Sequence, residues 1–249
     1  MRALLKSTII SRLLDRIRYF FYIVKVLARL IFGGPKSTCN ICGFHGRFRA
    51  YGYPPRYNAK CSRCGSLERH RLLALWVNSH RQLLAGRKML HFAPEVVMQR
   101  IVKPIVGSYE SADIAPLRAD MVLNIEQIAL PDQSVDVILC SHVLEHVNDR
   151  RALAELIRVL RSDGFALIMV PIVEGWSETY ENASITTEAD RIWHFGQKDH
   201  VRYYGGDLRR RIVEAGFDVE EFTAVEPNLQ TYALVRGEKV FITRKKAAA

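Results

Sequence analysis

The feature that most constrains the fold is an alternation of short apolar runs with segments of helical periodicity, which begins at Lys88. The run Val135–Ser141 is almost continuously apolar, as expected for a strand that is buried on both faces of a sheet. Arg151–Arg161 instead spaces its large apolar residues for one face of a helix. Alternating strands and helices predict an α/β fold with a doubly wound, mostly parallel sheet that binds ligands at the carboxyl ends of its strands.

The same patterns give boundaries for the expected elements. Strands are expected at Lys88–Phe92, Tyr109–Ile114, Met121–Ile125, Val135–Ser141, Phe165–Pro171, Phe217–Val225 and Tyr232–Thr243. Helices are expected at Leu67–His80, Val96–Val102, Arg151–Arg161 and Asp207–Ala215. Asp163-Gly164 is expected to form a turn, and 174–204 is a long polar stretch.

Ahead of this region lie two C-x-x-C pairs, Cys39/Cys42 and Cys61/Cys64, separated by 18 residues. Two such pairs at this spacing indicate one tetrahedral zinc ion, and four thiolates leave no open position, so the zinc is expected to be structural. Redox and iron–sulfur roles are the alternatives. The fifth cysteine, Cys140, stands in an apolar run and is expected to be a small buried hydrophobic residue.

The net charge of +10 is divided unevenly along the chain. Residues 1–88 hold 18 Lys/Arg and 2 Asp/Glu, whereas residues 89–249 hold 18 and 24. The first third of the chain is therefore expected to meet an anionic partner, such as phospholipid or nucleic acid.

Residues 1–32 alternate apolar clusters with basic residues. Their longest apolar run, Tyr19–Val24, has six residues, whereas a membrane-spanning helix needs about 20. A helix lying in the membrane interface fits better, and a helix packed on the protein's own surface is the alternative. Gly33-Gly34-Pro35 ends it, so we expect an amphipathic helix at 1–34, a zinc module with a linker helix at 35–87 and a catalytic domain at 88–246.

Polar residues stand at the ends of three expected strands. Asp113 closes one strand, and a carboxylate at this place in a nucleotide-binding sheet accepts hydrogen bonds from both ribose hydroxyls. Asn124 and Ile125 close the next, where one can hydrogen-bond an adenine amine and the other can pack on the ring. Ser141 and His142 close the fourth, next to the crevice where the reactive group is expected.

These residues belong to a longer pattern that resembles the class I S-adenosylmethionine-dependent methyltransferases of the small-molecule type. The pattern comprises Asn124-Ile125-Glu126, Leu130-Pro131-Asp132, Val135-Asp136-Val137-Ile138, His142-Val143-Leu144-Glu145-His146-Val147 and Glu155-Leu156-Ile157-Arg158-Val159-Leu160-Arg161-Ser162-Asp163-Gly164. The resemblance covers about residues 88–243 and implies a seven-stranded Rossmann-like sheet. The cysteine pairs with Gly65–Arg71 and Phe195–Arg202 resemble a bacterial subgroup with a small zinc-ribbon-like module at its front.

The resemblance implies a set of cofactor-binding residues. They are Phe92, Ala93, Pro94, Glu95, Asp113, Ile114, Asn124, Ile125, Ser141 and His142. One departure is that the family's first loop is usually rich in glycine, whereas here it reads His91-Phe92-Ala93-Pro94-Glu95. Ala93 is small enough for close approach, and Glu95 can accept hydrogen bonds from the cofactor's ammonium group. A degenerate domain that acts only as a scaffold is the alternative.

Methyl transfer depends mainly on aligning the nucleophile with the methyl group and the sulfur, and an oxygen or nitrogen acceptor also needs a base. His200, beside Asp199 in the polar stretch, is the first candidate for this base. His142 is the second, followed by the pair Glu145-His146, which can instead hold the loop in place.

The polar and aromatic stretch 176–202 is expected to cover the acceptor, which predicts a polar small molecule, such as a sugar or an acid. An RNA methyltransferase that grips RNA with its basic zinc module is the alternative. The resemblance implies a bacterial cytoplasmic protein, and residues 1–32 place it at the inner face of the membrane as a peripheral protein.

Overall fold

The computed structural model describes residues 2–32 and 35–246, and the side chains of 11–29 and 35–246. The chain divides into two compact units. The first comprises Met1–Arg71 with Pro227–Leu234, and the second comprises Leu72–Glu226 with Val235–Ala249.

The first unit contains a long helix and two small antiparallel strand pairs. Its elements are α1 (Arg2–Phe32), β1 (Lys36–Thr38), β2 (His45–Arg47), β3 (Arg49–Tyr51), β4 (Arg56–Lys60) and the short α8 (Asn228–Thr231). β1 pairs with β2, and β3 pairs with β4. The sequence predicts that Gly33-Gly34-Pro35 ends the helix α1, and Gly33 and Gly34 lie outside the described residues.

One buried arginine ties the 227–234 segment into the first unit. The guanidinium of Arg71 donates hydrogen bonds to the carbonyls of Tyr232 and Ala233 at 2.7 and 2.8 Å, and to those of Ala59 and Ser66 at 3.0 and 2.8 Å. The prediction of a strand from Tyr232 was therefore wrong over its first half. The carbonyls of Tyr232 and Ala233 accept hydrogen bonds from Arg71 instead of from a neighbouring strand, and the strand begins at Lys239.

The second unit is built on one seven-stranded sheet with the order β12-β13-β9-β8-β5-β6-β7. The strands are β5 (Lys88–Phe92), β6 (Ser108–Asp113), β7 (Met121–Val122), β8 (Val135–Ser141), β9 (Leu160–Met169), β12 (Phe217–Thr223) and β13 (Lys239–Lys245). Only β13 runs antiparallel to its neighbours. This confirms the predicted mostly parallel, doubly wound sheet.

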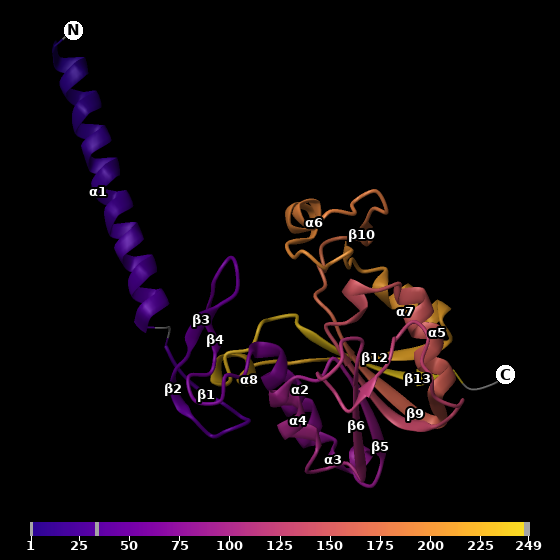
Figure 1. The fold of residues 1–249 in the computed structure, drawn as a ribbon. Helices are drawn as coiled ribbons and strands as arrows, with labels where there is room; N and C mark the ends of the chain where they lie inside the picture. Colours follow the sequence, from indigo (N-terminus) through magenta and orange to yellow (C-terminus); the bar gives the residue numbers. More distant parts are fainter. Residues whose placement is uncertain (1, 33–34, 247–249) are drawn as a thin grey trace. The chain divides into compact units, whose positions relative to one another are not determined.

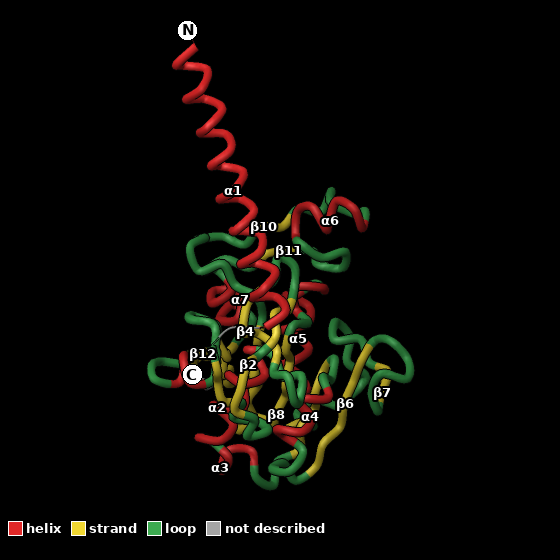
Figure 2. Tube along the Cα trace, turned by 90° about the vertical axis from the view of Figure 1, so that its left-hand side faces the viewer, coloured by secondary structure: helices red, strands yellow, loops and turns green. Residues whose placement is uncertain are grey.

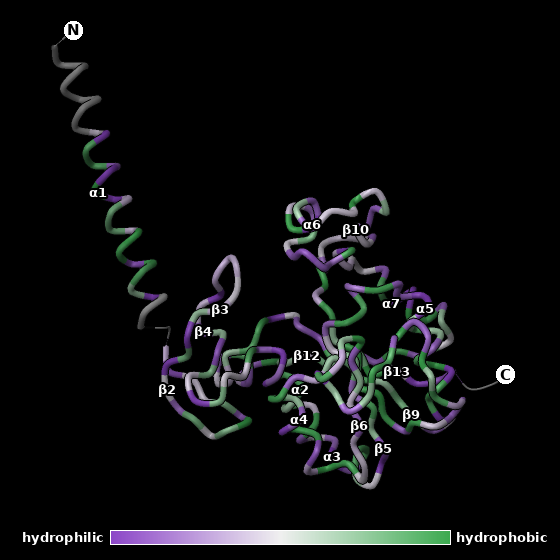
Figure 3. Tube along the Cα trace, viewed as in Figure 1, coloured by the Kyte–Doolittle hydropathy of each residue, from purple (hydrophilic) through white to green (hydrophobic). Residues whose placement is uncertain are grey.

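Helices cover both faces of this sheet (Figure 1). α2 (Glu68–Ser79), α3 (Arg81–Leu84) and α4 (Val96–Val102) lie on one side, whereas α5 (Asp149–Val159) and α7 (Leu208–Glu214) lie on the other. The central strands and α5 form the main core, in which Cys140 is fully buried, as expected for a small hydrophobic residue. Residues of these strands are mostly hydrophobic in Figure 3, because both of their faces are covered.

Two strand boundaries differ from the sequence prediction. Asp163-Gly164 does not form a turn but lies within β9, which begins at Leu160 directly after α5. Val135 of β8 pairs with Leu160 of β9, whereas Val137 pairs with Phe165. The residues of β9 between these two pairs therefore form an irregularity, such as a β-bulge, in the pairing of the two strands. β7 ends at Val122 rather than Ile125, because Asn124 forms a turn in which its Oδ1 accepts a hydrogen bond from the N–H of Glu126 at 2.9 Å.

The polar stretch after β9 contains its own local structure. β10 (Tyr180–Glu181) pairs with β11 (Arg202–Tyr203), and α6 (Glu188–Phe195) lies between them in sequence. Thr187 caps the start of α6 by accepting from the N–H of Asp190, and Gly196 ends it with a φ of 74°. Figure 2 shows these three elements together as one projection from the second unit.

Candidate functional site

The carboxyl ends of the parallel strands bring the predicted cofactor residues to one edge of the sheet. Phe92, the last residue of β5, lies opposite Ala112 of β6 and Cys140 of β8 in the register. The loops that follow these three strands are therefore neighbours, and they carry Ala93, Ile114 and His142.

The first of these loops has a glycine-like conformation without a glycine. Ala93 has a φ of 48°, in the left-handed region, and its N–H donates to the carbonyl of Ala112 at 2.8 Å. Phe92 is buried in the core, whereas Ala93, Pro94 and Glu95 are half-buried. Glu95 precedes α4 and stands at its N-terminal boundary.

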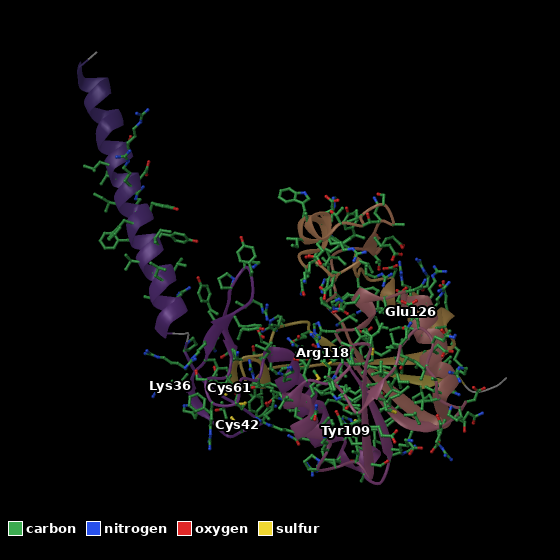
Figure 4. The ribbon with its side chains drawn as sticks, viewed as in Figure 1. Lys36, Cys42, Cys61, Tyr109, Arg118 and Glu126 are labelled. Atoms are coloured by element: carbon green, nitrogen blue, oxygen red, sulfur yellow. The ribbon has the colours of Figure 1, made fainter. Side chains whose placement is uncertain are left out.

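The next loop holds Asp113 at the end of β6. Its Oδ1 accepts a hydrogen bond from the N–H of Ala115 at 2.8 Å. Ile114 is 69% exposed, whereas Ile125 is only 5% exposed and packs into the core. The side chain of Ile114, next to Asp113 in the chain, is therefore open to a ligand, whereas that of Ile125 is covered by the protein. Asn124 is exposed one residue before Ile125, near Glu126, which Figure 4 labels.

The end of β8 leads directly into a group of histidines. Ser141 Oγ is buried and has no hydrogen-bond partner among the described residues. His142 has a φ of 56° and donates its N–H to the carbonyl of Met169 at 2.8 Å. Its Nδ1 lies 3.1 Å from Oε1 of Glu145. A carboxylate in this contact accepts, so Nδ1 of His142 carries the hydrogen and Nε2 has the free lone pair.

Two further histidines join Glu145, which lies in the 3₁₀ turn η1 (Leu144–His146). The rings of His146 and His200 meet edge to face with their centroids 4.7 Å apart. The N–H of Val201 donates to the carbonyl of Glu145 at 3.0 Å and fixes the loop that carries His200. His200 is buried, and this burial lowers its pKa.

Asp199, expected beside His200, is exposed and contacts a different histidine. Its carboxylate lies 3.5 Å from Nδ1 of His146, and its backbone carbonyl lies 3.2 Å from the same atom. The structure therefore brings together four side chains, those of His142, Glu145, His146 and His200. Within this group, Asp199 contacts the His146 side chain. Of these rings, that of His142 is 30% exposed, whereas His200 is 4% exposed.

The turn η1 is held by a buried arginine, the last residue of the Phe195–Arg202 motif, to which no role in the site was assigned from the sequence. Arg202 Nη1 donates to the carbonyls of Leu144 and Val147 at 2.7 and 2.5 Å, and Nε donates to Glu181 at 2.8 Å. The hydroxyl of Tyr204 also donates to the Leu144 carbonyl at 3.1 Å. Backbone acceptors give no sequence signal, and only the folded chain shows this support for Glu145.

The four predicted zinc ligands converge in the first unit. Cys39 Sγ lies 3.7 Å from Cys64 Sγ, and Cys42 Sγ lies 3.8 Å from Cys61 Sγ. All four sulfurs lie within 4.8 Å of one another, and Figure 4 labels Cys42 and Cys61. A tetrahedral zinc with Zn–S bonds of about 2.3 Å separates its sulfurs by about 3.8 Å, so this arrangement fits the ion.

The two cysteine pairs sit in equivalent turns. The N–H of Gly43 donates to the carbonyl of Cys39 at 2.9 Å, and that of Gly65 donates to Cys61 at 3.0 Å. Both glycines have positive φ, 70° and 75°, where a side chain is disfavoured. The glycine after each pair therefore allows the turn that presents both thiolates to one point.

The sequence of residues 91–168 matches the family model of a methyltransferase domain. This segment runs from β5 to β9 and includes the strand ends that carry Asp113, Asn124, Ser141 and His142. No curated protein matches the chain.

Solved structures share the fold at low sequence identity. A chain of the complex between the Haloferax volcanii Trm112 methyltransferase activator and a methyltransferase is 14% identical, with a TM-score of 0.54, over 72% of this chain and 91% of that one. The YcgJ protein of Bacillus subtilis is 14% identical, with a TM-score of 0.50, over 72% and 100%. The [4+2]-cyclase SpnF is 12% identical, with a TM-score of 0.51, over 76% and 86%.

The matched domain and the order of the seven strands agree with the resemblance seen in the sequence. Residues 91–168 therefore form a methyltransferase domain, and the sheet that contains them has the fold of the S-adenosylmethionine-dependent methyltransferases.

Proposed function

We propose that the protein transfers a methyl group from S-adenosylmethionine to a polar small molecule, with His142 as the base. The observation that carries the proposal is the position of His142. It follows β8 at the cofactor edge of the sheet, has a partly exposed ring and is hydrogen-bonded to the buried carboxylate of Glu145.

The cofactor is assigned to the edge formed by the first loops. Asp113 would accept hydrogen bonds from the ribose hydroxyls, and Ile114 and Asn124 would contact adenine. Ala93 and Pro94 allow the backbone to approach the amino-acid tail, and Glu95 would accept from its ammonium group. Ser141 Oγ, buried without a partner among the described residues, supports a ligand at this edge.

When bound, S-adenosylmethionine supplies a methyl group on a positively charged sulfur. The residues of this chain would orient the acceptor and take its proton. His142 Nε2 receives the proton of the acceptor hydroxyl or amine while Nδ1 keeps its hydrogen bond to Glu145. The acceptor atom would gain the methyl group in place of the proton that His142 takes. Such a base typically contributes about 10²–10⁴-fold in rate.

The geometry changes the order of the candidate bases. His200, the first candidate from the sequence, is buried, and Asp199 contacts His146. We assign both to the support of the site rather than to direct contact with the acceptor.

A polar acceptor is favoured by the projection of β10, α6 and β11. Its residues include the hydrogen-bonded pair Tyr180 and His194, whose Oη and Nδ1 are 2.7 Å apart. Glu178 also lies here and pairs with Arg210 at 3.0 Å. Hydroxyls and carboxylates of a sugar or an acid can form further hydrogen bonds with such groups.

Calorimetric titration with S-adenosylhomocysteine tests the cofactor site in the full-length protein. We expect micromolar binding that Asp113→Ala weakens by at least about tenfold, since a paired hydrogen bond to a charged group contributes about 1.5–3 kcal/mol. Glu110→Ala, which removes a carboxylate from the same strand away from the edge, is the control. Equal binding by the Asp113 variant would refute the assignment.

We further propose that Cys39, Cys42, Cys61 and Cys64 hold one structural zinc ion, because their sulfurs lie at the separations that a tetrahedral zinc requires. The enclosed site has four sulfur ligands and no position for a substrate, so its role is to stabilise the small strand pairs around it.

We also propose that α1 binds an anionic membrane surface. None of the helices in the described part of the chain is long and apolar enough to cross a bilayer. Large apolar side chains of α1 are exposed, including Tyr19, Phe20 and Phe21 at 63–66%. Basic residues alternate with them along the helix, as Figure 3 shows, which suits the interface between headgroups and acyl chains.

A further inference from the structure

The histidine cluster contains two buried polar atoms that have no hydrogen-bond partner among the described residues. They are Oε2 of Glu145 and Nδ1 of His200. Glu145 is 1% exposed and His200 is 4% exposed, so water does not reach either of them freely. A buried polar atom without a partner costs about 1–3 kcal/mol, and two in one cluster indicate a missing ligand.

The same residues, with His146, form a set of metal-ligating side chains. Glu145, His146 and His200 each offer one ligand atom, and these three atoms lie within 4.8 Å of one another. Nitrogen and oxygen ligands around a tetrahedral ion lie about 3.3–3.6 Å apart.

The neighbouring hydrogen bonds leave one lone pair on each residue for an ion. Oε1 of Glu145 is occupied by Nδ1 of His142, which leaves Oε2. Nδ1 of His146 faces the carbonyl of Asp199, an acceptor, so this nitrogen carries the hydrogen and Nε2 has the lone pair. Metal-binding histidines are commonly oriented in this way, by a carbonyl or carboxylate on the second nitrogen.

We propose that Glu145, His146 and His200 bind one divalent transition-metal ion, with zinc as the best match to two imidazoles and one carboxylate. The three ligands come from η1 and from the loop before β11, so the ion would join these two segments. Three protein ligands leave a position open for water or for an oxygen of the acceptor. This site is separate from the four cysteines and does not depend on which molecule is methylated.

Metal content of the full-length protein tests the proposal. The protein is equilibrated with zinc, desalted and analysed by mass spectrometry for bound metal. The wild type should hold one more zinc ion than Glu145→Gln and His200→Ala, whereas His194→Ala, which removes a histidine of α6 outside the cluster, should match the wild type. Circular dichroism establishes that each variant is folded.

A second series separates this site from the cysteines. Cys61→Ser removes a ligand of the other site, and in this background zinc binding should still depend on His200. Cobalt gives an independent readout, because its visible spectrum differs between four sulfur ligands and mixed nitrogen and oxygen ligands. Wild-type protein that holds no more zinc than the two variants, in folded samples, would overturn the proposal. Neither measurement uses cofactor or acceptor, so its failure is distinct from failure of the proposed methyl transfer.

Discussion

At the residue scale, the site depends on side chains and backbone angles that are individually unfavourable. Ala93 and His142 both have positive φ, and both stand directly after strands that end at the cofactor edge. Strained residues of this kind persist only where surrounding contacts hold them. Here the contacts are backbone hydrogen bonds, from Ala93 to Ala112 and from His142 to Met169.

Replacing Ala93 by glycine should stabilise the protein. Relief of the left-handed conformation contributes about 1–2 kcal/mol, and the added freedom of the unfolded chain offsets about 0.5–1 kcal/mol of this. We expect a net increase of about 0.5–1 kcal/mol in the free energy of unfolding, measured with urea. Ala154→Gly, at an exposed position within α5, should instead destabilise by about 1 kcal/mol. A loss of stability in Ala93→Gly would contradict the strain argument.

His91 should make the protein sensitive to mild acid. Its ring is fully buried in β5, with Nδ1 2.8 Å from the hydroxyl of Tyr109, and burial lowers its pKa to about 3. The unfolded chain binds a proton below about pH 6.5, and the folded chain does so only near pH 3. The free energy of unfolding should therefore fall as the pH falls through this window, by about 2 kcal/mol at pH 5.

Urea unfolding between pH 5 and 7.5 checks this, with tryptophan fluorescence as the signal, because all three tryptophans lie in the second unit. His91→Asn should flatten the pH dependence, whatever its effect on stability at pH 7.5. His194→Asn, which changes a partly exposed ring, should not. If His91→Asn kept the slope of the wild type, another group would be responsible.

At the element scale, the projection and η1 form one supported assembly. Arg202 of β11 binds the carbonyls of η1, and Arg211 of α7 pairs with Asp149, Glu181 and Asp207 at 3.0, 2.8 and 3.0 Å. Most of these charged side chains are buried, and each is paired with a side chain of opposite charge. Removal of one side chain would therefore leave a buried charge without its partner. The position of Glu145 therefore depends on residues far from it in sequence.

The helix α1 is the element that should bring the protein to membranes. Phe20→Ser with Phe21→Ser should lower the amount of protein that sediments with anionic vesicles by at least about tenfold, because each buried Phe contributes about 1.5–3 kcal/mol. Vesicles of neutral lipid should bind the wild type less. Tyr53→Ser, at a fully exposed aromatic residue of the first unit, is the matched control. Equal sedimentation of the double variant and the wild type would refute membrane binding. Binding of the protein to bulk RNA with a steep salt dependence would instead favour nucleic acid as the anionic partner.

At the scale of the whole molecule, the two units rely on different sources of stability. The second unit has a large apolar core, whereas in the described part of the first unit the apolar cluster around the cysteines has Cys39, Phe48 and Cys61 as its buried members. A core of this size is too small to hold a fold without a metal or a similar cross-link.

Removal of zinc should therefore unfold part of the molecule only. Hydrogen exchange followed by mass spectrometry should show faster exchange across residues 36–65 after chelation, while β5, β8 and β9 stay protected. Structural zinc contributes roughly 10–16 kcal/mol in small zinc domains, which is comparable to the whole stability of about 5–15 kcal/mol that a domain usually has. Cys42→Ser should reproduce the effect of the chelator. Unchanged exchange at 36–65 after complete removal of metal would contradict a structural role.

Shared fold does not by itself establish methyl transfer, since the [4+2]-cyclase SpnF has a similar fold. A non-catalytic scaffold would fail to bind S-adenosylhomocysteine, and an RNA methyltransferase would bind RNA through the basic first unit. The cofactor titration and the vesicle assay above therefore also separate these alternatives from small-molecule methylation.

The sequence by itself determined the sheet, the four cysteines as candidate ligands and the carboxyl ends of β5 and β8, because periodicity and spacing are local properties of the chain. Asp113 and His142 could be singled out, since a parallel sheet places all its carboxyl ends at one edge. Only the tertiary structure decided that the carbonyls of Tyr232 and Ala233 accept hydrogen bonds from Arg71. It also decided that Ile114 rather than Ile125 is exposed. Finally, it brought the side chains of Glu145, His146 and His200 together. These outcomes depend on burial and on backbone acceptors from distant segments, and the order of residues along the chain carries no signal for either.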